Sequence, residues 1–220
     1  MKVPFLSQYL DRINAQRLAK WEQQQQELAV EQDRIQKLKH QQQWRIVIGS
    51  KLSESTSDIS IRYCPPGNVP DDIEFPATLK SLTFDYSSLT TLPQSICDLT
   101  ELTELRVFDS HLNTLSEGIG NLTKLTSLVV RNSCLDRLPE SIGNLTNLFY
   151  LDLQVNQLTV LPQSMSNLQN LVEIDLWNNP IDDFSILDRL PNLSRYCRQS
   201  LSFNTLTSYI DKPLIKYVTL

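Results

Sequence analysis

The sequence predicts an α/β solenoid in which a parallel sheet follows an N-terminal helix. Three observations lead to this fold: a repeat of fixed length, a Leu-Pro step that closes most repeats, and a glutamine-rich segment that precedes them. The frame L-x-x-L-x-L-x-x-[N/S]-x-L-x-x-L-P recurs every 23 residues and begins at Leu79, Leu102, Leu125, Leu148 and Leu171. A unit this short cannot bury its own apolar face, so it has to stack on its neighbours.

Residues 1–43 are predicted to form a glutamine-rich helical extension. Pro4 suits the first turn of a helix, and no further proline or glycine occurs before Gly49. Apolar residues at steps of three, four and seven mark one helix face: Leu6, Leu10, Ile13, Leu18, Trp21, Leu28, Ile35 and Leu38. Gln25 and Gln32 weaken the coiled-coil seam. Two alternatives therefore stay open: weak self-association through this helix, or a solvated extension that packs only its first turns on the repeats.

Residues 44–78 are predicted to be an N-terminal cap with a degenerate repeat. The apolar run from Trp44 to Ile48 has strand character and ends at Gly49. A degenerate repeat in the same register follows. Ile59 and Ile61 take its apolar positions, and Cys64 takes its polar position. Val69–Pro70 stands in place of the closing Leu-Pro step. Terminal repeats are often atypical because they shield the open end of the core.

Residues 79–200 hold the regular repeats, and residues 201–220 are predicted to form a C-terminal cap. Within L-x-x-L-x-L, two leucines two residues apart point to the same side of a strand, so each repeat supplies one strand to a parallel sheet. A polar column can satisfy backbone groups where the chain leaves the sheet. Its members are Ser87, Ser110, Ser133, Asn156 and Asn179. Because serine reaches less far than asparagine, we expect the early repeats to be less regular.

The period and the Leu-Pro step resemble the leucine-rich repeat family, in its 23-residue class with L-P-x-x-I-x-x-L. That class includes the Ras-pathway scaffold repeats of animals, the plant intracellular Ras-group repeats and bacterial proteins of similar design. The resemblance covers about residues 56–197 and leaves out the N-terminal helix. It implies an arc whose concave parallel sheet binds another protein.

The outward-facing strand positions, called the concave face below, are the predicted binding surface for a protein partner. Aromatic residues and arginines are the types that anchor protein interfaces, and here strand packing does not require them. The candidate residues are Tyr86, Glu104, Arg106, Phe108, Arg131, Tyr150, Asp152, Gln154, Glu173, Asp175 and Trp177. The alternative is a solvated face whose aromatic residues merely cover the neighbouring strands.

Composition and motifs argue against other classes of function. The net charge of −5 and the pI of about 5.1 provide no basic field for nucleic acid or anionic lipid. No apolar stretch approaches the ~18 residues of a membrane span. His40 and His111 are far apart in the chain, and no catalytic or nucleotide-binding motif is present. The Asp152 and Asp175 carboxylates could bind a cation, but a charged solvent face is more common. We expect no catalytic residue, metal or cofactor.

The four cysteines, Cys64, Cys97, Cys134 and Cys197, include no C-x-x-C pair. Cys97 and Cys134 occupy apolar repeat positions, so we expect buried free thiols and a reducing compartment. The N-terminal apolar run is too short for a signal-peptide core. The sequence therefore predicts a cytoplasmic, non-enzymatic interaction module. The alternatives are a bacterial effector that enters a host cell without a Sec signal, and a homo-oligomeric assembly protein that dimerises through the N-terminal helix.

Overall fold

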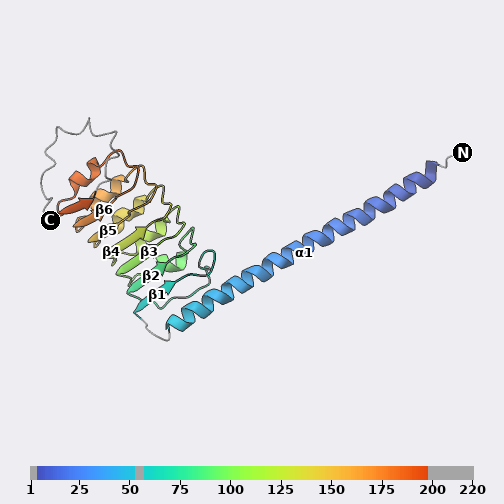
Figure 1. Ribbon diagram of the computed structural model, residues 1–220, viewed down its shortest axis with the longest axis horizontal. Helices are drawn as coiled ribbons and strands as arrows, with labels where there is room; N and C mark the ends of the chain where they lie inside the picture. Colours follow the sequence, from blue (N-terminus) through green and yellow to red (C-terminus); the bar gives the residue numbers. More distant parts are fainter. Residues whose placement is uncertain (1–3, 53–56, 198–220) are drawn as a thin grey trace.

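The structure is a computed structural model that describes residues 4–52 and 57–197. A long helix, α1 (Pro4–Leu52), leads into a parallel sheet whose seven strands follow one another in chain order. The strands are β1 (Asp58–Arg62), β2 (Ser81–Asp85), β3 (Glu104–Phe108), β4 (Ser127–Arg131), β5 (Tyr150–Asp152), β6 (Glu173–Asp175) and β7 (Arg195–Cys197). Figure 1 shows the stacked strands and α1 projecting away from them. The predicted C-terminal cap at residues 201–220 lies outside the described residues.

The strand register confirms the 23-residue period. Asp58 pairs with Ser81, and Ser81 pairs in turn with Glu104, so the degenerate repeat joins the sheet in frame. Outward and inward residues alternate, as they must in a strand. The inward leucines at equivalent positions of β2 to β5 have no exposed surface: Leu82, Leu105, Leu128 and Leu151. These residues form one continuous core that runs the length of the array.

Short helical turns form the second layer and cover the other side of this core. They are α2 (Gln94–Cys97), η1 (Glu117–Asn121), η2 (Glu140–Asn144), η3 (Gln163–Asn167) and η4 (Ser185–Arg189). The prolines of the Leu-Pro steps lie directly before three of these turns, and their φ angles are between −68° and −71°. The proline ring fixes φ at the point where the chain turns back from the sheet. Neighbouring turns pack closely, since a Cβ added at Gly143 would lie 2.5 Å from Ser164 O.

The predicted strand at residues 44–48 is wrong, because α1 continues through this segment to Leu52. Trp44 and Ile48 lie one helical turn apart and are both buried, with the Trp44 ring 6.3 Å from the Phe84 ring in an edge-on arrangement. A short apolar run looks alike in a strand and in a buried helical turn, so periodicity alone could not separate them. Trp44 and Ile48 close the open end of the core.

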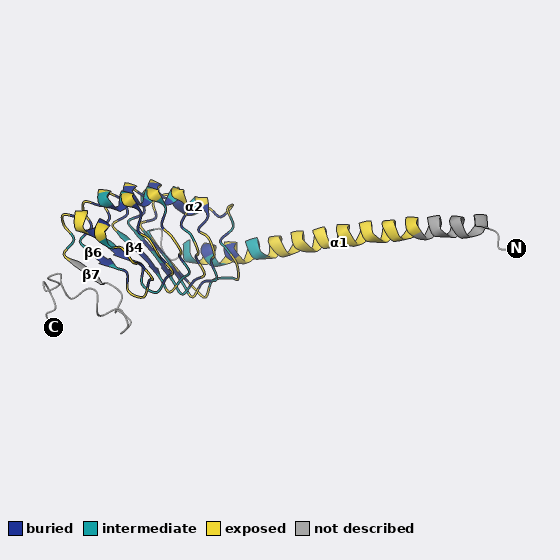
Figure 2. Cartoon of the chain, turned by 90° about the horizontal axis from the view of Figure 1, so that it is seen from above, coloured by how far each residue is buried: buried dark blue, intermediate teal, exposed yellow. Residues whose placement is uncertain are grey.

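The repeats therefore contact the last turns of α1, whereas the alternative of a solvated extension placed the contact at its first turns. Arg45 Nη2 lies 2.8 Å from Asp72 Oδ2, and Trp44 Nε1 donates a hydrogen bond to His40 Nε2 at 3.0 Å. Among the residues of α1 whose burial is described, Figure 2 shows the buried ones only near the repeats. Residues 15–39 are exposed.

The early repeats are not less regular than the later ones, contrary to expectation. Strands β2 to β4 have five residues each, whereas β5 and β6, next to the asparagines of the polar column, have three. The Asn156 carboxamide donates to Val130 O at 2.7 Å and to Leu153 O at 3.0 Å. Because the Asn156 side chain donates to backbone carbonyls at the end of the strand, the regular backbone hydrogen bonding between strands ends earlier there. In the serine repeats, the Ser110 and Ser133 hydroxyls bind each other at 2.7 Å.

Candidate functional site

The predicted partner-binding residues lie on the outward side of the sheet and, with one exception, retain exposed surface. On β3, Glu104, Arg106 and Phe108 alternate with buried residues. Tyr86 is 56% exposed and Trp177 is 43% exposed, although both are large and apolar. The sequence pattern therefore assigned these side chains to the correct side of the strands. The exception is Asp152, which is 1% exposed.

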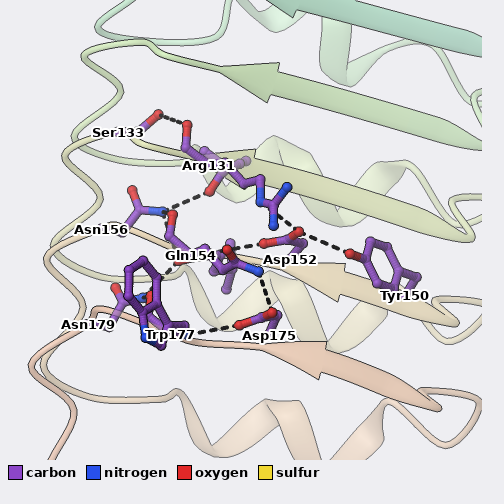
Figure 3. Close-up of polar contacts among 11 residues, drawn as sticks. Arg131, Ser133, Tyr150, Asp152, Gln154, Asn156, Asp175, Trp177 and Asn179 are labelled. Atoms are coloured by element: carbon purple, nitrogen blue, oxygen red, sulfur yellow. Dashed lines mark hydrogen bonds and ion pairs between the residues drawn. The ribbon is translucent and has the colours of Figure 1, made fainter. Parts of the chain in front are cut away.

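Asp152 is the centre of a hydrogen-bonded cluster at the end of β5 (Figure 3). Its Oδ2 atom accepts from Arg131 Nε at 2.9 Å and from the Tyr150 hydroxyl at 3.0 Å. Its Oδ1 atom accepts from Gln154 N at 3.2 Å. The expectation that Asp152 presents its carboxylate at the surface is wrong, because these neighbours cover it. Asp152 instead positions Arg131 and Tyr150.

Burial and charge set the protonation of this cluster. Burial raises the pKa of the Asp152 carboxyl above its ordinary value, while hydrogen bonding and Arg131 oppose the rise. Burial, together with the nearby Asp152 charge, raises the pKa of Tyr150 to about 12. Tyr150 therefore keeps its proton at neutral pH and remains a donor to Asp152. The Arg131 side chain, although paired, is still 40% exposed.

A second carboxylate, Asp175, continues the cluster onto β6. Its Oδ1 atom accepts from Trp177 N at 3.0 Å, and its Oδ2 atom accepts from Gln154 Nε2. Gln154 thus links the two carboxylates through its backbone and its side chain (Figure 3). Across the described residues, no group of three His, Cys, Asp or Glu side chains is arranged to hold a metal ion. The two carboxylates act as hydrogen-bond acceptors that fix neighbouring side chains.

An open depression of about 430 Å³ lies at the carboxyl ends of β3 to β5. It is lined by Phe108, Asp109, Arg131, Asn132, Gln154 and Val155. Three of these residues, Phe108, Arg131 and Gln154, belong to the predicted surface. The other three each follow the outward strand column by one residue, and the prediction did not include them. Their 23-residue spacing is the signal that could have found them.

The residues at this position share a left-handed backbone conformation. The column, with φ between 49° and 58°, consists of Tyr63, Tyr86, Asp109, Asn132, Val155 and Asn178. Asparagine and aspartate tolerate this region, whereas a β-branched residue such as Val155 is strained there. Tyr63, which was also missed, stacks on Tyr86 with ring centroids 5.4 Å apart and is 77% exposed. The exposed aromatic surface therefore extends into the degenerate repeat.

Other charged side chains at this face of the sheet form local pairs. Arg106 Nη2 lies 3.1 Å from Glu104 Oε2 on the same strand, and Arg62 Nε lies 3.3 Å from Asp85 Oδ2 on the neighbouring strand. Such partly exposed pairs contribute little to stability, about 0–1 kcal/mol each. Both arginine side chains stay accessible at the surface, with 43% and 72% of their area exposed.

Three cysteines, Cys64, Cys97 and Cys134, are free thiols. Cys97 is buried as predicted, whereas Cys134 is only half-buried. Burial raises the pKa of Cys64 to about 11 and also raises the pKa of Cys97. Because the thiolate is the reactive form, neither of these two thiols is activated at neutral pH.

Comparisons with known proteins agree with this architecture. A family profile described as "Leucine-rich repeat region" matches residues 105–218. A leucine-rich repeat protein of Leptospira interrogans is similar in structure, with 31% identity and a TM-score of 0.55, over 63% of this chain and 36% of that protein. The ectodomain of the plant receptor kinase GASSHO1/SCHENGEN3 from Arabidopsis thaliana, solved in complex with CASPARIAN STRIP INTEGRITY FACTOR 2, is 24% identical, with a TM-score of 0.57.

The matched plant structure covers 63% of this chain, which spans only 18% of that ectodomain. No curated protein sequence matches the chain. Among the residues that the structure describes, no helix has the length and apolar content that crossing a membrane requires.

Proposed function

The chain belongs to the leucine-rich repeat family, and we propose that it is a non-enzymatic module that binds a protein partner on its concave face. The observation that carries this proposal is the exposed aromatic surface there. Tyr86 and Trp177 are each more than two-fifths exposed, and Phe108 lines the depression beside Arg131. Aromatic residues and arginine are enriched among the residues that dominate binding energy.

The hydrogen bonds of the concave face support the same function. Immobilising a long side chain on binding costs about 0.5–1.5 kcal/mol. Asp152 already holds Arg131, and Asp175 already holds Gln154, so part of this cost is met before a partner arrives. A pre-organised arginine beside an apolar ring suits a partner that offers a carboxylate next to an apolar side chain.

The non-enzymatic part of the proposal rests on the state of the candidate reactive groups. His40 Nε2 is occupied by the Trp44 indole, and the Asp152 and Asp175 carboxylates are engaged by neighbouring donors. The thiols of Cys64 and Cys97 are protonated at neutral pH. These groups serve structure rather than acid–base or nucleophilic chemistry.

The proposal is tested by capturing partners from a lysate with the full chain, read by mass spectrometry. Trp177→Ala combined with Phe108→Ala removes two aromatic groups of the concave face. Val160→Ala is the matched control, because Val160 is 59% exposed in the segment between β5 and η3. We expect a partner whose recovery falls at least tenfold with the double variant and is unchanged with the control. Unchanged recovery with a folded double variant would place the binding surface elsewhere.

The origin of the captured partner also separates two cellular settings. We propose the cytoplasm, and a partner from the same cytoplasm supports it. A host protein bound through the concave face would instead support the alternative of a bacterial effector.

A further inference from the structure

The projecting part of α1 carries an apolar stripe that nothing in the described chain covers. Its members, with their exposed fractions, are Leu18 (56%), Trp21 (58%), Leu28 (49%), Ile35 (43%) and Leu38 (55%). Large apolar side chains at helical spacing on a surface mark an interaction site more often than idle surface. Most helical stability in proteins comes from packing an apolar face, so a partner on this stripe would stabilise α1.

The repeats do not cover this stripe, because they contact the opposite face of α1. At about 100° per residue, Trp44 and Ile48 lie roughly 160° and 200° around the helix from Leu28. Ile46, by the same arithmetic, lies in line with Leu28 at about 0°, and it is 66% exposed beside the buried Trp44 and Ile48. The repeats therefore leave the stripe open to a partner.

The spacing of the stripe is mirror-symmetric about Leu28. Trp21 and Ile35 each lie seven residues from Leu28, and Leu18 and Leu38 each lie ten residues from it. The sequence continues the symmetry with Leu10 and Ile46, each 18 residues away. The remaining large exposed apolar side chain between residues 15 and 39, Val30, has no mirror partner and lies about 200° around the helix from Leu28.

We propose that a second copy of this chain covers the stripe, with the two α1 helices antiparallel about a two-fold axis at Leu28. In this arrangement Leu28 meets its own copy, and Trp21 of each chain meets Ile35 of the other. Leu18 and Leu38 lie about 80° to either side of Leu28 around the helix, so they flank these central contacts, at the same height along the pair. A mirror-symmetric pattern matches itself when one helix is reversed, and the reversed pair also separates the two sets of repeats, which a parallel pair would place at the same end.

The geometry of the rest of the chain is compatible with this pair. Trp44 lies 16 residues from Leu28, or about 24 Å along the axis, so the two sets of repeats attach about 48 Å apart. The stripe from Leu18 to Leu38 spans about 30 Å of helix. Gln25 and Gln32 are uncharged and carry both donors and acceptors, so they can pair across the seam.

Sedimentation of the full chain over a range of concentrations tests the association. The expected result is a mass that rises from 25.3 kDa to twice that value. Leu28→Glu places two carboxylates against each other at the axis and should weaken the dimer at least tenfold. Val30→Glu makes the same change two residues away on the opposite face and should leave the dimer intact. A monomer at every concentration, or equal effects of the two substitutions, would overturn the proposal.

Oxidative cross-linking tests the orientation, with the unsubstituted chain as the background for the native thiols. The antiparallel pair predicts that Leu28→Cys forms a covalent dimer alone. Trp21→Cys should form one only when mixed with Ile35→Cys. A covalent dimer formed by Trp21→Cys alone would show a parallel pair and contradict the proposed axis.

Discussion

Replacing Asn156 by alanine removes hydrogen bonds that join two neighbouring repeats at the centre of the array. The Asn156 amide nitrogen donates to Val130 O at 2.7 Å, Leu153 O at 3.0 Å and Gln154 O at 3.3 Å. Its Oδ1 atom accepts from Leu135 N at 3.1 Å. Asn156 is 6% exposed, so water cannot replace these contacts without opening the core.

The size of the loss follows from these partners. The two amide N–H groups contribute about 1 kcal/mol each, and the buried Leu135 N–H left without an acceptor adds about 1–3 kcal/mol. We therefore expect Asn156→Ala to lower the free energy of unfolding by about 3–5 kcal/mol. For a chain of this size, that loss corresponds to a fall in Tm of about 6–20 °C.

Urea unfolding followed by circular dichroism measures this loss, and Ser133→Ala is the control. Ser133 fills the same position one repeat earlier, where its hydroxyl pairs with Ser110 and is only half-buried. We expect Ser133→Ala to cost about 1 kcal/mol or less. If Asn156→Ala costs no more than Ser133→Ala, the asparagine does not stabilise the array in the way the contacts imply.

Three further perturbations test the core, the backbone and the surface charges. Leu151→Ala, at a fully buried site, should lower the free energy of unfolding by about 2–5 kcal/mol in urea unfolding. Val155→Asn should stabilise the fold by roughly 1 kcal/mol and so raise the Tm by about 2–4 °C, because it removes the strain of a β-branched residue at φ 56°. Hydrogen bonds from Lys124 and Lys80 lower the pKa of Glu101 from 4.5 to about 2, so its stabilisation is present above pH 4.5 and is lost as the pH falls toward 2. Glu101→Gln should remove this part of the pH dependence in acid titrations of stability.

Each of these expectations has a specific contrary result. Val160→Asn, at an exposed residue outside the left-handed column, should change the Tm little, and a gain equal to that of Val155→Asn would remove the strain argument. A loss below about 1 kcal/mol for Leu151→Ala would mean that the core does not depend on tight stacking. An unchanged acid profile for Glu101→Gln would show that its lysine contacts do not persist in solution.

The sheet could be predicted from the sequence because the 23-residue period fixes both the pairing register of the strands and which of their side chains face the core. Even the degenerate repeat, with Ile59 and Ile61 in place of leucines, pairs in the predicted frame. The helical conformation of residues 44–48 could not be predicted, since the run from Trp44 to Ile48 fits a strand and a helix equally well. Only the packing of Trp44 on Phe84 selects the helix.

The candidate surface was predicted in part, for a related reason. Residue type and strand alternation identify outward positions such as Phe108 and Trp177. The burial of Asp152 depends on how Tyr150 and Arg131 fold over it from two strands, which the linear pattern does not encode. Apart from Tyr86, the left-handed column was not among the predicted binding residues, because its backbone conformation is set by the repeat, not by residues that prefer it.

The measurement that tests the central claim most directly is the affinity of the captured partner for two arginine variants, by titration calorimetry. Arg131→Gln alters the concave face, whereas Arg137→Gln alters a 73%-exposed arginine in the segment after β4. A concave-face interface predicts binding at least tenfold weaker for Arg131→Gln, about 1.4 kcal/mol, and unchanged binding for Arg137→Gln. Equal affinity for both folded variants would contradict partner recognition at this surface.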